Sequence, residues 1–79
     1  MSTRLIVAST STSGECDLFL CEAHNLVASL GEMAGMGAEG FEDITADPRR
    51  AQALIEHLEE NDFYVDPKVK AWVQSRLAV

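Results

Sequence analysis

The chain has 79 residues, of which 47% are hydrophobic and 24% are charged, and this balance indicates one small globular domain and argues against intrinsic disorder. A net charge of −7 with only six Lys and Arg residues argues against direct binding to nucleic acid or to an anionic membrane, and it favours a protein partner with a basic surface. No apolar run approaches the ~20 residues of a membrane span. Two cysteines without a recognisable signal segment predict free thiols and a cytoplasmic location.

Residues 4–9 predict a strand. The β-branched pair Ile6 and Val7 follows Leu5, and the run ends in polar residues. Its continuous apolar character is typical of a strand that is buried on both faces.

Residues 14 to about 33 predict a helix. Thr12 and Glu15 have the spacing of a capping box, and Ser13 is the alternative N-cap. Apolar residues recur at steps of three and four: Cys16, Phe19, Leu20, Ala23, Leu26, Val27, Leu30 and Met33. The competing interpretation is a second strand at residues 16–23, paired with the first as a hairpin. The helix is favoured because the apolar residues from 18 to 21 run together instead of alternating.

Residues 31–40 hold four of the five glycines and predict a connector. Met33 and Met36 are expected to fold back on the core, with an adaptable contact surface as the alternative. A short strand is predicted at residues 41–45.

Two further helices begin with the same signal, an N-cap aspartate followed by proline, at Asp47-Pro48 and Asp66-Pro67. Asn61 is the predicted left-handed stop of the first, and residues 63–65 are either a third strand or a linker. The predicted buried stripes are Ala51, Leu54, Ile55 and Leu58 in the first helix and Val69, Trp72, Val73 and Leu77 in the second. The fold class is therefore α+β in a single domain, in the order β-α-β-α-(β)-α, with a two- or three-stranded sheet packed by helices.

The acidic residues are unevenly distributed. Residues 1–66 carry a net charge of −10, whereas residues 67–79 carry +3. Such a charge is typical of a solvated face that keeps a small protein soluble, and it also fits a binding surface for a basic partner, including mimicry of a nucleic-acid backbone. Three glutamates of the first Asp-Pro helix lie within one and a half turns and predict one exposed patch. The candidate binding residues are Glu42, Asp43, Asp47, Glu56, Glu59, Glu60 and Asp62.

The sequence contains no Ser/His/Asp triad, phosphate-binding loop or complete metal cluster, and we expect neither catalysis nor a cofactor. Cys21 and His24 are three residues apart, but a structural zinc site would need two more ligands. Cys21 is expected to pack as a small apolar residue and His57 to lie on a helix surface. Cys16 is a candidate thiol site at a helix start, with burial in the apolar stripe as the alternative.

A strand, a hydroxyl-rich loop and a helix with a thiol in its first turn resemble the front of glutaredoxins and other thioredoxin-fold proteins. Residues 13–16 read S-x-x-C where that family has C-x-x-C. Residues 6–11 and 40–44 are similar to the first two strands of the SH3-binding glutamate-rich proteins, which have a glutaredoxin fold. The resemblance implies that Ser13 replaces the nucleophilic cysteine and that Cys16 stands in the resolving position, so dithiol exchange would be lost.

These patterns predict a small acidic protein that acts by binding another protein. A regulatory adaptor and a phage-type inhibitor of a basic, nucleic-acid-binding partner both fit. The alternative is a thioredoxin-like, thiol- or redox-linked protein that uses Cys16. A third interpretation is anion binding by the loop of residues 9–14 at a helix N-terminus.

Overall fold

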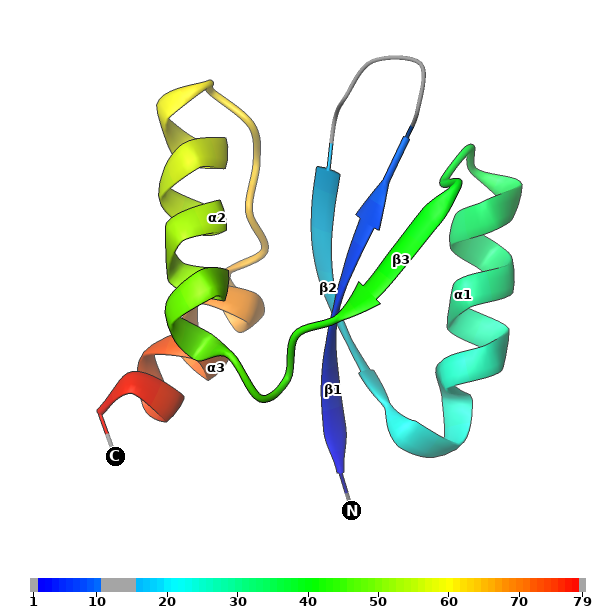
Figure 1. Ribbon diagram of the computed structural model, residues 1–79, viewed down its shortest axis with the longest axis horizontal. Helices are drawn as coiled ribbons and strands as arrows, with labels where there is room; N and C mark the ends of the chain where they lie inside the picture. Colours follow the sequence, from blue (N-terminus) through cyan, green and yellow to red (C-terminus); the bar gives the residue numbers. More distant parts are fainter. Residues whose placement is uncertain (1, 11–15, 79) are drawn as a thin grey trace.

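The computed structural model describes residues 2–10 and 16–78 (Figure 1). Within them lie three strands and three α-helices, so the α+β class is confirmed. The strands are β1 (Thr3–Ser9), β2 (Cys16–Glu22) and β3 (Gly40–Asp43). The helices are α1 (Leu26–Gly35), preceded by a 3-10 turn at Ala23–Asn25, α2 (Pro48–Glu60) and α3 (Pro67–Leu77).

The strands form one antiparallel sheet in the order β2-β1-β3. Figure 1 shows α1 on one side of this sheet and α2 with α3 on the other. The central strand β1 is therefore covered on both faces, and four consecutive residues from Leu5 to Ala8 are buried. Leu5 and Val7 join the core on the side of α2 and α3, whereas Ile6 and Ala8 lie on the side of α1. The predicted strand at residues 4–9 is confirmed.

The helix predicted from residue 14 is wrong in its first part, because residues 16–22 form strand β2 and pair with β1 as a hairpin. The reason is burial on both faces: Leu18 packs in the core with Leu5 and Val7, while Phe19 is half-buried on the opposite face. A strand with apolar side chains on both faces loses the alternation that identifies strands in sequence. The proposed cap at Thr12, Ser13 and Glu15 lies outside the described residues.

The predictions for α2 and α3 are confirmed. The Asp47 carboxylate accepts a hydrogen bond from the Arg50 backbone N–H at 3.1 Å, and Asp66 caps α3 through the Lys68 N–H at 2.9 Å. Each proline occupies the first turn, where its missing N–H has no helical partner to lose. Residues 63–65 form the linker and not a third strand. The main core lies between these helices and the sheet; it consists of Leu5, Val7, Leu18, Ile44, Ala51, Ile55, Leu58, Val65, Val69 and Val73.

The opposite layer is thinner. Helix α1 has no buried residue, and Val27, which the predicted stripe placed inside, is 85% exposed. The predicted stripe assumed one continuous helix from residue 14, whereas α1 begins only at Leu26. The fold therefore depends mainly on the layer of α2 and α3.

Candidate functional site: a hollow between two helix ends

Helix α1 ends in a Schellman motif. Gly37 has a left-handed backbone (φ 104°) that suits glycine, and its N–H donates to the Ala34 carbonyl at 3.1 Å. The next N–H, that of Ala38, donates to the Met33 carbonyl at 3.0 Å. In this motif the residue after the turn commonly packs on the residue that begins the last turn, which here places Ala38 beside Met33.

Helix α2 ends in the same way. Asp62 takes the left-handed position (φ 61°), and its N–H donates to the Glu59 carbonyl at 3.2 Å. The Phe63 N–H donates to the Leu58 carbonyl at 2.9 Å. The helix stops at Asn61 as predicted, but the left-handed residue is the following aspartate, since Asn61 itself has φ −100°. Asn61 contributes a side-chain hydrogen bond to the His57 carbonyl at 2.8 Å.

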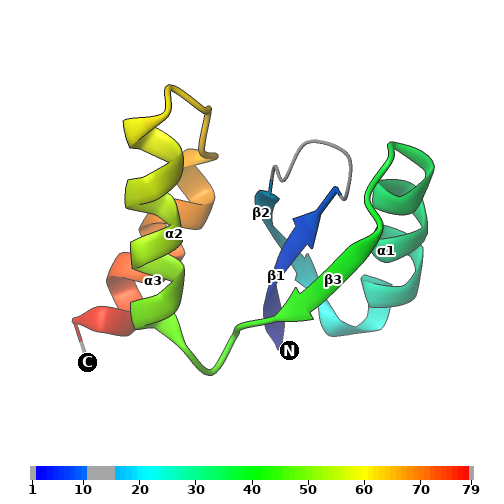
Figure 2. The same ribbon diagram turned by 45° about the horizontal axis from the view of Figure 1, so that its top comes forward.

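These two helix ends flank one hollow of about 420 Å³. Both helices end at the same end of the molecule, beside the end of β1 and the start of β2 (Figures 1 and 2). The described residues that line the hollow are Ala8, Thr10, Cys16, Asp17, Met33, Met36, Ala38, Leu58, Phe63 and Tyr64. Residues 11–15 lie outside the described part of the chain. The volume of the hollow falls in the range of small-molecule binding pockets.

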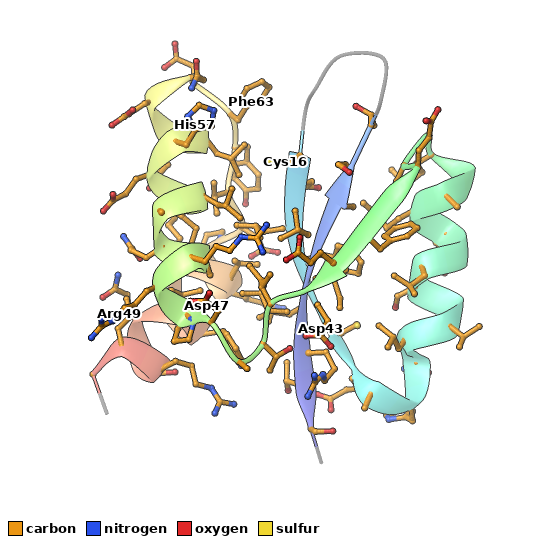
Figure 3. All side chains as sticks on the ribbon, in the orientation of Figure 1. Cys16, Asp43, Asp47, Arg49, His57 and Phe63 are labelled. Carbon is orange, nitrogen blue, oxygen red and sulfur yellow. The ribbon has the colours of Figure 1, made fainter. Side chains whose placement is uncertain are left out.

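The lining is mostly apolar and partly exposed. Met36 is 79% exposed, Tyr64 80% and Phe63 44%, which is unusual for large apolar side chains grouped at one place. Met33 is half-buried, so only one of the two methionines folds back as expected. Figure 3 places Phe63 and Cys16 on facing elements across this space. Sequence reasoning missed the hollow because its lining comes from four separate parts of the chain.

The seven candidate acidic residues fall into two groups. Asp43 and Asp47 lie toward the end of the molecule away from Phe63 (Figure 3), and Glu42 precedes Asp43 in β3. The members of this first group are engaged: Glu42 pairs with Arg50, Asp43 pairs with Arg4 at 2.8 Å, and Asp47 caps α2.

Two of these carboxylates have shifted pKa values. The hydrogen bond from Arg50 lowers the pKa of Glu42, and Glu42 in turn raises the pKa of Arg50. For Asp43 partial burial would raise the pKa, but hydrogen bonds from Thr45 and Arg4 outweigh it and lower the pKa. These acids therefore stabilise the corner between β3 and α2.

The second group lies on the last two turns of α2 and just beyond it; its three glutamates are about 13–20 Å along the helix from Asp47. Glu56 accepts a hydrogen bond from Gln52 at 3.2 Å, and Glu59 pairs with Lys70 at 3.1 Å. Glu60 and Asp62 are exposed and make no side-chain ion pair within the described part of the chain. We call Glu56, Glu59, Glu60 and Asp62 the α2 acidic patch.

The thiols lie apart. Cys16 and Cys21 are free, and their odd spacing on β2 points their side chains to opposite faces of the sheet. Cys16 is half-buried, directly opposite Ser9, and it begins a strand instead of a helix. It lines the hollow and also a second one of about 360 Å³ between the sheet and α2, beside Leu54 and Arg50. Ser13 lies outside the described residues.

Over residues 2–10 and 16–78, no helix is long and apolar enough to cross a bilayer, and no three metal-ligating side chains come together. His57 is exposed on α2, as expected. Comparison of the chain with protein-family models, curated protein sequences and solved structures finds no match. Function is therefore inferred from the geometry alone.

Proposed function

We propose that this protein is non-catalytic and acts by binding another protein through the α2 acidic patch. The observation that carries the proposal is the contrast between the two acidic groups. Glu42, Asp43 and Asp47 are used by the fold, whereas the patch leaves the carboxylates of Glu60 and Asp62 available to a partner.

The patch favours a partner with a basic surface. Exposed charges of one sign raise the rate at which an oppositely charged protein associates, and the effect weakens with salt. Phe63 and Tyr64 follow the patch directly and are exposed, and aromatic side chains are enriched at protein interfaces. Partners of this kind include proteins whose basic groove binds nucleic acid, which an adaptor or an inhibitor would cover.

Neutralising the patch tests the proposal. We expect the triple variant Glu56→Gln, Glu59→Gln, Glu60→Gln to associate about tenfold more slowly with a partner captured from cell extract at low salt. The rate should converge with that of the unmodified protein at high salt, because screening removes the steering. Association rates measured by biolayer interferometry across a salt series give the result.

The matched control is Glu42→Gln, Asp43→Asn, Asp47→Asn, which changes the net charge by the same amount at the other end of α2. Asn retains the N-cap function at residue 47. Binding slowed equally by both triple variants would show that overall charge, and not the patch, is responsible. Unchanged binding in the patch variant would contradict the proposal.

A thiol-linked function is the second candidate, because Cys16 is the one residue of the described ranges 2–10 and 16–78 that lines both hollows. It predicts that Cys16 in the folded protein reacts with iodoacetamide at least as fast as in urea, as judged by mass spectrometry. Cys21→Ser isolates the Cys16 signal. A Cys16 thiol that reacts only after denaturation contradicts this function.

A further inference from the structure

We infer that the hollow between the ends of α1 and α2 is a docking site for a cationic peptide segment, which inserts one apolar side chain between Met36 and Tyr64. The inference rests on the proposed function and names the chemistry of the partner: an apolar anchor residue flanked by Lys or Arg.

The apolar part of the argument comes from the two Schellman motifs. Each motif brings an apolar pair to the mouth of the hollow, Met33 with Ala38 and Leu58 with Phe63. Met36 and Tyr64 are next to these pairs, line the hollow and are largely exposed. An inserted side chain of the partner would cover this surface, and removal of apolar area from water is the main source of binding free energy.

The charge of the occupant follows from the surroundings. None of the described lining residues is Lys or Arg, while Asp17 lines the hollow and Asp62 is next to Phe63. Helices α1 and α2 both direct their C-terminal ends here, and a helix C-terminus carries partial negative charge. The carboxylates and the helix C-termini both make the surroundings of the hollow negative, and both therefore favour a positively charged residue beside the apolar anchor of the partner.

Asp62 gives a separate indication. A left-handed residue after a helix is usually glycine, and an aspartate there is strained relative to glycine. A charged residue at a position where glycine would stabilise the fold is expected when the charge serves binding. Asp62→Asn keeps a side chain that tolerates this backbone and removes only the charge.

The probe is a series of synthetic peptides with one central variable residue, an alanine on each side, and Lys and Arg beyond. We expect peptides with central Leu, Met or Phe to bind at least about tenfold tighter than the peptide with central Ala, as measured by fluorescence anisotropy. The chain has three methionines, and two of them line the hollow. The ¹³C-methyl NMR signals of Met33 and Met36 should therefore shift on binding of the apolar peptides.

Variants of the protein locate the site. Met36→Ala and Tyr64→Ala should each lower the affinity for the peptide with central Leu by about fivefold or more. Val27→Ala, which changes an exposed apolar residue elsewhere on α1, should leave this affinity unchanged. Asp62→Asn should weaken binding at low salt while the melting temperature stays the same or rises. Circular dichroism confirms that each variant is folded.

Three results would overturn the inference: equal affinity for all central residues, unshifted Met33 and Met36 methyl signals, or equal affinity of peptides with Gln in place of Lys and Arg. The patch triple variant could weaken binding of all peptides equally while the Met36 and Tyr64 variants bind them with unchanged affinity. In that case the acidic-patch function stands and the hollow is not the docking site. Tight binding of the Leu peptide that is insensitive to the patch variant would instead contradict the acidic-patch function alone.

Discussion

Replacement of Ile55 by Ala should lower the free energy of unfolding by about 2–5 kcal/mol, the cost of truncating a large aliphatic side chain in a closed core. Ile55 lies on α2 and is 2% exposed, packed in the main core with residues of the sheet and α3. A domain of this length has a total stability of roughly 4–12 kcal/mol, so the variant should lose a large share of it. Urea denaturation followed by circular dichroism measures the change.

The control for Ile55 is its own smaller truncation. Ile55→Val should cost only about 0.5–1.5 kcal/mol, because it removes one methylene and leaves a smaller cavity. Val27→Ala on α1 should change stability by no more than about 0.5 kcal/mol, since Val27 is exposed. Equal losses at Ile55 and Val27 would mean that the two layers contribute alike, contrary to the burial seen here.

This asymmetry between the layers also explains what could be predicted from the sequence. Helices α2 and α3 begin with Asp-Pro and carry apolar stripes at helical spacing, and local chemistry of this kind is decisive for helix boundaries. Strand β1 is recognisable because its β-branched apolar run ends abruptly in polar residues.

Strand β2 is different. Its apolar residues from Leu18 to Cys21 face both layers, so neither the alternation typical of a strand nor the spacing typical of a helix stands out in the sequence. The hairpin interpretation of residues 16–23, which the poor alternation disfavoured, describes the structure better than the helix. Pairing with β1 makes residues 16–22 a strand, and this pairing depends on the tertiary structure and not on the local sequence.

The candidate site divides in the same way. The exposure of the glutamates on α2 follows from helical spacing, so the patch could be predicted. That Glu42 and Asp43 are engaged by Arg50 and Arg4 could not, because the partners are 8 and 39 residues away along the chain. The hollow also depends on the left-handed conformation of Asp62, for which the sequence contains no glycine signal.

The second large effect is expected at Thr45, which joins β3 to the central strand. Its hydroxyl accepts a hydrogen bond from the Leu5 N–H at 2.9 Å and donates to the Asp43 carboxylate at 2.5 Å. Leu5 is fully buried, so Thr45→Val would leave its N–H without an acceptor, at a cost of about 1–3 kcal/mol in unfolding free energy. Thr45→Ser keeps the hydroxyl and should lose much less.

Asp43 provides an independent measurement of the same contact. Its lowered pKa means that the carboxylate stabilises the fold above the ordinary value of 3.8 and that this contribution is lost as the pH falls through the lower, folded value. Thr45→Val removes one of the hydrogen bonds that lower the pKa, so the pKa of Asp43 should rise and the gain in stability with rising pH should shrink below about pH 4. Thr45→Ser should retain both properties, and NMR titration of the Asp43 carboxyl distinguishes the two variants. An unchanged Asp43 pKa in Thr45→Val would show that Arg4 and the Thr45 backbone N–H, which donates to the same carboxylate at 2.9 Å, hold it ionised without the hydroxyl.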